Sequence, residues 1–239
     1  MMKITYLYHS GFAVELAEHV LVFDYFQGEL PQWDGSKTIL FFASHKHEDH
    51  FSLKIFDLFG QYDKLHYFLG SDIKLNRKYL ERKGIDPAVS ERITCTGKNT
   101  TTRWETITVE TLRSTDEGVA WLVTVEGKTI YHAGDLNWWH WEGEDDSWNR
   151  QMAVDYKKEI SRIEGRHFDV AFVPLDPRLE ESYALGMLTF LEHTDTDVVF
   201  PMHMWDRYEI ISRLKADSKG KQYRERIMDV RQPGQEFIV

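Results

Sequence analysis

Metal-binding side chains crowd into one short stretch of the sequence, SHKHEDH. Three histidines and two carboxylates lie within six positions there, directly behind the apolar run Ile39–Phe42 and two small residues. Imidazole and carboxylate together are ligands for zinc, manganese or iron, and calcium prefers oxygen ligands alone. We therefore interpret this stretch as a candidate metal-binding loop. Its metal-binding side chains are His45, His47, Glu48, Asp49 and His50.

The spacing inside the loop favours two ions. His45 and His47 are two positions apart, so in an extended backbone they project to the same side and can chelate one ion. Asp49 and His50 are adjacent and project differently, which suits a second ion close to the first. The alternative is an exposed polar loop that happens to contain histidines. We favour metal binding because the whole pattern follows a strand that is apolar on both faces.

Three further predicted strands also end in loops that carry reactive side chains. The sequences at these ends are HAGD, PLDPR and PMHMWD. In α/β proteins, ligands gather at the carboxyl ends of the strands. We therefore expect Asp135 and His203 to converge with the SHKHEDH loop on one pocket.

The elements that would position these loops are short strands and a few helices. Apolar, aromatic and β-branched runs predict strands at 3–8, 12–16, 19–25, 39–43, 92–96, 106–112, 119–125, 128–134, 169–174, 197–203 and 235–239. Helices are predicted to follow Ser52 and Ser71 as caps, the second ending at Gly84. Three more helices are expected near 149–164, 182–193 and 208–216.

Length and charge limit the classes of protein. A chain of 239 residues fits one large domain, residues 1–239, or two intimately packed halves. A net charge of −10 gives no support to a nucleic-acid partner. Cys95 is the only cysteine, which excludes an intramolecular disulfide and favours a reducing compartment. We find neither a signal peptide nor an apolar run long enough for a membrane span, so we expect a cytoplasmic protein.

Taken together, these motifs resemble the metallo-β-lactamase fold hydrolases over nearly the whole chain. The run His45–His50 is similar to the His-x-His-x-Asp-His signature of that superfamily. IYHAGD matches the strand whose final aspartate, here Asp135, bridges two metals, and FPMH matches the strand that ends in a ligand histidine, here His203. The opening strands end in a matching aspartate, Asp24. The small branch that includes ascorbate-6-phosphate lactonase is the most similar one.

This resemblance implies an α/β (α+β) fold, a four-layer αββα sandwich built from two similar halves with the metals at one edge. It also implies one or two ions, zinc above all, with manganese or iron as alternatives. The ligands that it implies are His45, His47, Asp49, His50, Asp135 and His203.

One departure from the family pattern concerns the first metal site. The family usually has a further histidine in the loop that reads TLRSTDEG here, and this loop contains none. Ser114 or Asp116 could ligate instead, or His140 could reach the site. Otherwise the first site is weak or empty, and the second site is the better occupied.

The expected activity is hydrolysis of a small molecule such as a lactone, an ester or a phosphoester by a metal-activated water. Asp49 and Asp135 could orient this water and exchange a proton with it. The alternative is a protein of the same fold that binds metal or ligand without turnover. We expect no nucleic acid and no membrane as a partner, and the sequence does not predict an oligomeric state.

The residues around a substrate are less constrained by the sequence. Trp138, Trp139 and His140 follow Asp135 closely and could form a pocket wall or lid, or else pack on the body of the protein or in a subunit interface. Arg178 could bind a substrate carboxylate or phosphate, or form a salt bridge with its neighbour Asp176. His9 and His132 could hold metal ligands in place or be structural. Trp141 and Trp148 have the same possible roles as Trp138 and Trp139. We expect Cys95 to be structural.

Overall fold

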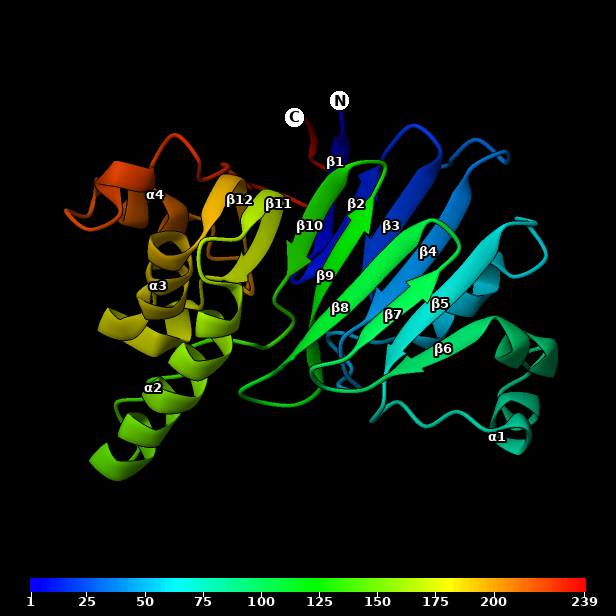
Figure 1. The fold of residues 1–239 in the computed structure, drawn as a ribbon, viewed down its shortest axis with the longest axis horizontal. Coiled ribbons are helices and arrows are strands. Elements are labelled where there is room, and N and C mark those ends of the chain that lie inside the picture. Colours follow the sequence, from blue (N-terminus) through cyan, green and yellow to red (C-terminus); the bar gives the residue numbers. More distant parts are fainter. The chain divides into compact units, whose positions relative to one another are not determined.

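The computed structural model describes all 239 residues, and the chain divides into two compact units. The first unit comprises Met1–Gly97 with Pro233–Val239, and the second comprises Lys98–Gln232. Each unit contains one mixed β-sheet and its own helices (Figure 1). No helix combines the length and the apolarity that a membrane crossing requires.

The first unit is built on a seven-stranded sheet with the order β13-β1-β2-β3-β4-β5-β6. The strands β1, β2, β3 and β13 pair antiparallel where they meet, and β3, β4, β5 and β6 run parallel. Because β13 pairs with β1, the two chain ends lie side by side (Figure 1). The bounds are β1 Lys3–Tyr8, β2 Gly11–Glu15, β3 His19–Phe23, β4 Thr38–Ala43, β5 Leu65–Gly70, β6 Ile93–Thr96 and β13 Glu236–Ile238.

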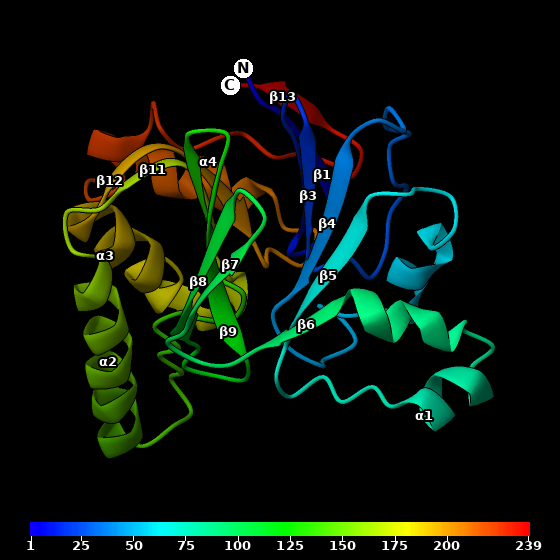
Figure 2. The ribbon, with the colours of Figure 1, turned by 45° about the vertical axis from the view of Figure 1, so that its right-hand side comes forward.

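One face of this sheet forms a hydrophobic core with the short helices of the unit. Alternate residues of β4, such as Phe41, point to this face, because side chains in a strand alternate between its two sides. Phe41 stacks on Tyr67 of β5, with ring centroids 5.7 Å apart. The core continues into the 3-10 helices Leu53–Leu58 and Pro87–Arg92 and the α-helix α1, Arg77–Arg82 (Figure 2).

The start of α1 corrects one prediction. Ser71 was expected to cap a helix over the following residues, but α1 begins only at Arg77 and is capped by Asn76. The Asn76 side chain accepts a hydrogen bond from the backbone N–H of Tyr79 at 2.9 Å. The Ser52 cap is confirmed, although the helix that it begins is of the 3-10 type.

The second unit is built on a six-stranded sheet with the order β12-β11-β10-β9-β8-β7. The strands β10, β11 and β12 run parallel, and the remaining pairs are antiparallel. The bounds are β7 Thr101–Trp104, β8 Ile107–Arg113, β9 Val119–Val125, β10 Lys128–His132, β11 His167–Pro174 and β12 Asp195–Met202.

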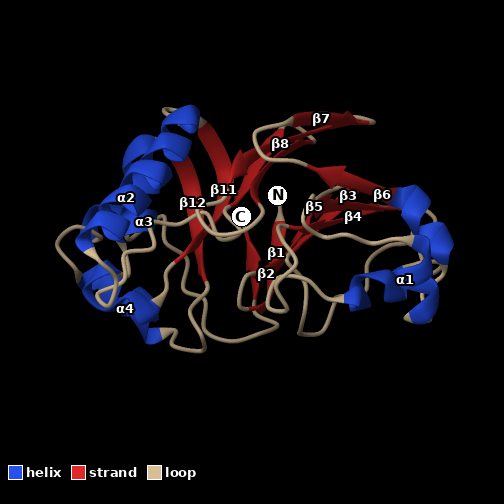
Figure 3. Ribbon diagram, turned by 90° about the horizontal axis from the view of Figure 1, so that it is seen from below, coloured by secondary structure: helices blue, strands red, loops and turns tan.

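Three helices lie beside β11 and β12 in this unit (Figure 3). They are α2 Asp146–Ile160, α3 Leu185–His193 and α4 Glu209–Ala216. Phe190 of α3 packs on the sheet, its ring 4.7 Å from that of Tyr131. The hydroxyl of Tyr156 on α2 donates to the carbonyl of Gly186 on α3 at 2.8 Å. Two mixed sheets with flanking helices confirm the α/β class that the sequence predicted.

Parallel strands explain where the reactive loops lie within each unit. Neighbouring parallel strands end at the same edge of their sheet, so the loops after β3 and β4 are brought together. The loops after β10, β11 and β12 are brought together in the same way in the second unit. Each sheet thus gathers its own group of metal-binding side chains.

Candidate metal centre

A buried carboxylate orients a buried imidazole in the first unit. Asp24 follows β3, and its Oδ2 atom lies 2.7 Å from Nδ1 of His50. The backbone N–H and the hydroxyl of Ser44 also donate to Asp24, each at 2.7 Å. Because Nδ1 of His50 is held by Asp24, Nε2 is the ring nitrogen that a metal would take.

His45 and His47 turn their rings toward each other, as their spacing predicts. Nε2 of His45 lies 2.9 Å from Nδ1 of His47, and Nδ1 of His45 lies 2.9 Å from the hydroxyl of Ser44. Two donors bound to one tetrahedral zinc at about 2.0–2.1 Å lie roughly 3.3 Å apart. The two imidazoles are therefore close to the separation that a shared ion requires.

Asp49 lies between two imidazoles of the same unit. Its Oδ2 atom is 3.5 Å from Nε2 of His9 and 3.9 Å from Nε2 of His50. Burial alone would raise the pKa of this carboxyl, but the hydrogen bond from His9 and the charges of His50 and His9 outweigh burial and lower it. Asp49 is consequently ionised at neutral pH, the form in which a carboxylate binds metal or accepts a proton.

The second unit repeats the pairing of a carboxylate with an imidazole. Asp176 follows β11, and its Oδ2 atom lies 2.8 Å from Nδ1 of His203, which follows β12. Nε2 of His203 lies 3.5 Å from Oδ1 of Asp135. Burial tends to raise the pKa of Asp176, but hydrogen bonds from His203 and Arg178 lower it to about 2.

The loop that carries Asp135 is fixed by backbone and side-chain contacts. The hydroxyl of Thr115 donates to the carbonyl of Asn137 at 2.6 Å and accepts from the N–H of Asn137 at 3.0 Å. The indole of Trp139 donates to the carbonyl of Asp135 at 3.0 Å. Gly186 of α3 allows close packing here, because a Cβ atom in its place would lie 1.8 Å from Oδ1 of Asn137.

The sequence left three candidates for the missing histidine, and the structure separates them. Carboxylate oxygens of Asp116 and Asp135 lie within 4.8 Å of each other, so Asp116 is placed to act as a ligand. The hydroxyl of Ser114 instead accepts from the N–H of Asp116 at 3.1 Å. His140 does not belong to any group of clustered ligand atoms.

Aromatic side chains surround His203, although they are only partly the expected ones. Trp139 and Trp205 approach the imidazole edge-on, with centroid distances of 5.4 and 5.6 Å. Trp138 instead packs beneath the ammonium group of Lys157 on α2, 4.4 Å from the ring centroid. The predicted pocket residue Trp139 therefore lies against the candidate ligand, and Trp138 packs on the body of the unit. Sequence reasoning missed Trp205, for which its place just after PMH was the available signal.

Residues at these strand ends adopt left-handed backbone conformations. The φ angles of His9, Asp24 and His203 are 54°, 42° and 64°. Trp205 and Asp206 follow with φ angles of 52° and 59°. Such conformations are strained for residues other than glycine and cluster at functional sites.

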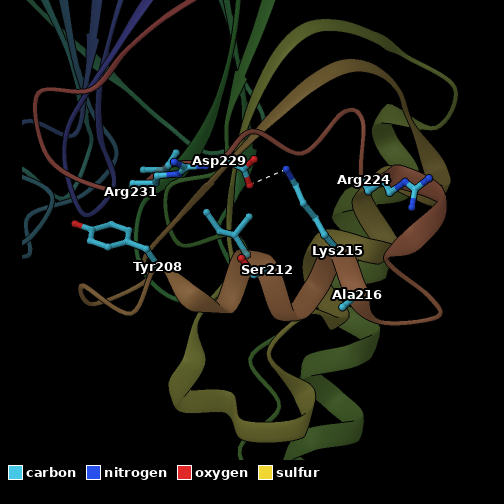
Figure 4. A pocket seen from close by; sticks show the side chains of 9 residues that line it. Tyr208, Ser212, Lys215, Ala216, Arg224, Asp229 and Arg231 are labelled. Carbon is cyan, nitrogen blue, oxygen red and sulfur yellow. Dashed lines mark hydrogen bonds and ion pairs between the residues drawn. The ribbon is translucent and has the colours of Figure 1, made fainter.

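A cavity of about 440 Å³ lies elsewhere in the second unit, beside α4 (Figure 4). Ser212 and Lys215 of α4 line it together with Tyr208, which precedes the helix, and Lys215 forms an ion pair with Asp229 at 2.7 Å. Its lining includes none of the strand-end residues described above, so we do not associate it with the metal-binding groups.

The donor sets in both units fit a transition metal. Each unit offers an imidazole whose Nδ1 is bound by a buried carboxylate, beside a further carboxylate within 4 Å of its Nε2 atom. This combination suits zinc, manganese or iron. The roles of Asp24 and Asp176 were not predicted, because a single sequence does not show which imidazole a strand-end aspartate will meet. That the two groups share one centre stays a prediction.

Comparisons with known proteins identify a family and a fold. Residues 3–142 match a family model described as a beta-lactamase superfamily domain. No curated protein matches the chain. Three solved structures that resemble it over nearly its whole length are at most 19% identical in sequence, so their likeness concerns the fold alone.

The first of these is a possible metal-dependent hydrolase from Veillonella parvula, with a TM-score of 0.62, 12% identity and full coverage of both chains. The second is Igni18, a metallo hydrolase from Ignicoccus hospitalis, with a TM-score of 0.59, 19% identity and coverage of 100% of this chain and 99% of that one. The third is the metallo-beta-lactamase fold protein YhfI from Bacillus subtilis, with a TM-score of 0.56, 12% identity and coverage of 99% and 98%.

Proposed function

Because the chain belongs to the beta-lactamase superfamily and has its metallo-β-lactamase fold, we propose that it is a metal-dependent hydrolase of small molecules. The observation that carries the proposal is the repeated pairing of Asp24 with His50 and of Asp176 with His203. A carboxylate that holds one ring nitrogen of a histidine, so that the other can bind metal, is a recurrent feature of metal sites. Here each of the two imidazoles also has a further carboxylate within 4 Å of its Nε2 atom, and together they form the donor set of a metal site.

We propose that the metal ligands are the six residues that the sequence predicts, with Asp116 as the replacement for the missing histidine. The six are His45, His47, Asp49, His50, Asp135 and His203. Zinc is the metal that we favour, and manganese or iron suits the same donors. A bound ion of this kind supplies hydroxide at neutral pH and polarises the oxygen of a carbonyl or phosphoryl group.

Side chains of the protein would then position the attacking water and shield the site from solvent. Asp49 is ionised at neutral pH, so its carboxylate can orient the attacking water by accepting a hydrogen bond from it. Trp139 and Trp205 flank His203 and would exclude bulk water from this side of the site. The substrate class that we propose is a lactone, an ester or a phosphoester.

A second candidate function is metal or ligand binding without turnover. The absence of a histidine in the TLRSTDEG loop favours it, because Asp116 is an exposed side chain and exposed ligands hold metal less firmly. In either case, we propose a cytoplasmic protein, since the single cysteine Cys95 fits a reducing compartment.

The test begins with metal analysis of protein purified without added metal. A panel of generic ester, lactone and phosphodiester substrates is then assayed before and after chelation and after the return of zinc or manganese. We expect turnover that disappears with the metal, is lost in Asp49→Asn, and survives in Asp169→Asn. Asp169 is a matched control because its carboxylate pairs with Lys128 at 2.7 Å near the start of β11.

Two results would contradict the proposal in different ways. Turnover that is unaffected by verified removal of the metal would exclude a metal-dependent mechanism. Bound metal without turnover of any substrate in the panel would favour the binding protein.

A further inference from the structure

We infer that the substrate carries an anionic group, a carboxylate or a phosphate, and that the guanidinium of Arg178 binds it. This inference rests on the proposed function, because it places the substrate beside His203. It is drawn from three features of Arg178: its ion pair, its unoccupied donors and the aromatic rings around it.

The ion pair fixes Arg178 one carboxylate away from a candidate metal ligand. Oδ2 of Asp176 lies 2.6 Å from Nη2 of Arg178 and 2.8 Å from Nδ1 of His203. Nε of Arg178 lies 3.0 Å from each oxygen of the same carboxylate. The guanidinium therefore has a defined position next to the imidazole.

The same contacts leave one edge of the guanidinium available. A guanidinium has five N–H donors, and Asp176 engages only those of Nε and Nη2. Asp176 is the only carboxylate with which Arg178 forms an ion pair, and the side chain is 44% exposed. The N–H groups of Nη1 and Nη2 on this edge can thus donate two parallel hydrogen bonds to a second carboxylate or to a phosphate.

Two tryptophans hold the guanidinium plane. The Cζ atom of Arg178 lies 4.6 Å from the ring centroid of Trp205 and 5.5 Å from that of Trp141. Trp205 also contacts His203, so one ring bridges the guanidinium and the imidazole. A cation that is fixed by a carboxylate and two rings loses little side-chain entropy when a ligand binds.

Two exposed carboxylates close to Arg178 in sequence or space, those of Glu142 and Glu180, would repel an anionic substrate. The charge of Glu180, followed by the hydrogen bond that protonated Glu142 donates to it, raises the pKa of Glu142, so these two groups lie close together. Neither forms an ion pair with Arg178. Their repulsion of an anion is weakened by solvent and salt, whereas the guanidinium would contact the anion directly.

The experiment compares pairs of substrates that differ only in charge. One substrate is an ester or lactone with a carboxylate or phosphate on its acyl side. The other is the neutral analogue in which a methyl group replaces this anionic group, and both are assayed with the metal-loaded protein. The ratio of kcat/KM for the anionic to the neutral substrate should fall about 10- to 100-fold in Arg178→Met, the cost of losing hydrogen bonds to a charged group. Effects of the mutation that act through Asp176 and His203 cancel in this ratio. Arg178→Lys should lie between wild type and Arg178→Met, because it keeps the charge without the fork.

Arg213 provides a matched control. It also pairs with a carboxylate, Glu181, at 2.7 Å and lies 4.4 Å from the ring centroid of Tyr183. Arg213→Met should leave the ratio as in wild type. An unchanged ratio in Arg178→Met, or an equal fall in both variants, would overturn the inference.

A binding measurement separates this inference from the proposed function. In protein labelled with ¹⁵N-arginine, inorganic phosphate or acetate should shift the guanidinium signals that disappear in Arg178→Lys. If these signals do not move, the inference fails even when neutral substrates are hydrolysed. If they move but no substrate is turned over, the anion site stands and the proposed hydrolase fails. The larger shift, with phosphate or with acetate, identifies which anion the site prefers.

Discussion

Oδ2 of Asp176 lies 2.8 Å from Nδ1 of His203, and this contact decides which nitrogen of the imidazole faces Asp135. An ionised carboxylate accepts the N–H at Nδ1, so the neutral ring carries its lone pair at Nε2. Asp24 fixes the tautomer of His50 in the same way. Metal affinity should therefore depend on two residues that do not themselves bind metal.

Asp176→Asn should weaken zinc binding about 10- to 100-fold, because the amide no longer selects the tautomer or raises the basicity of His203. Competition titration with a chromophoric chelator measures the affinity. Asp229→Asn, whose carboxylate pairs with Lys215 at 2.7 Å, should bind zinc like wild type. Equal affinities in all three proteins would exclude a contribution of Asp176 to metal affinity.

The missing histidine should make the two metal equivalents unequal. We expect titration with zinc or manganese to show one tight equivalent and one weak equivalent. His203→Ala should abolish the tight one, and His45→Ala should leave it nearly intact. The reverse pattern would show that the two sites are ranked wrongly.

Asp116 should contribute to the weaker equivalent, since its carboxylate lies within 4.8 Å of that of Asp135. Asp116→Ala should therefore remove the weak equivalent without affecting the tight one. Calorimetric titration of wild type and of Asp116→Ala with zinc measures the number of ions that each protein binds. A weak equivalent that persists in Asp116→Ala would point to a different ligand.

Removal of the metal should lower thermal stability without unfolding the chain. A ligand that binds only the folded state adds about 2.7 kcal/mol at a hundredfold excess over Kd. For a chain of this size that corresponds to roughly 5–10 °C in Tm. Scanning calorimetry before and after chelation, and after the return of zinc, measures the shift, and an unchanged Tm after verified removal would contradict a tight site.

The buried imidazole of His66 should make the protein sensitive to acid. Burial, followed by the charge of Arg92, lowers the pKa of His66 from 6.5 to about 4, and its Nε2 atom lies 2.8 Å from the hydroxyl of Thr94. As pH falls below about 6.5, the unfolded state takes up the proton first, so stability declines between pH 6.5 and 4. The loss is on the order of 2–3 kcal/mol.

Urea denaturation of metal-free wild type and His66→Gln at pH 7.5 and 5.0 tests this prediction. Both proteins keep the other histidines, so the difference between their pH dependences isolates His66. His66→Gln should lose less stability on acidification than wild type. Parallel losses in the two proteins would place the acid sensitivity elsewhere.

Most strands could be predicted because their patterns are strong locally. The apolar run of β4 and the alternating pattern of β8 are enough to predict strands without knowledge of the tertiary structure. Two strands were missed: β5, LHYFLG, contains a histidine that is buried only in the folded unit, and β7, TTRW, is a short edge strand with exposed side chains. The start of α1 was misplaced because Ser71 was expected to be the cap, whereas the side chain of Asn76 caps the helix.

The candidate site was predictable where neighbours in sequence are also neighbours in space. His45 and His47 follow from their spacing alone. Contacts such as those of Asp24 with His50 and of Asp176 with His203 join residues 26 and 27 positions apart, and only the strand order creates them. The packing of Trp138 on α2, rather than beside His203, also depends on tertiary structure.

The left-handed backbone at His9, Asp24 and His203 sets a limit on how stable this protein can become. Each such residue costs about 1–2 kcal/mol relative to an unstrained conformation. Glycine would relieve that cost, but glycine has no side chain to hold or bind a metal. Selection of variants for thermostability alone would therefore favour replacements at these three positions. Because their strained backbone coincides with the candidate site, stability and activity should trade against each other there.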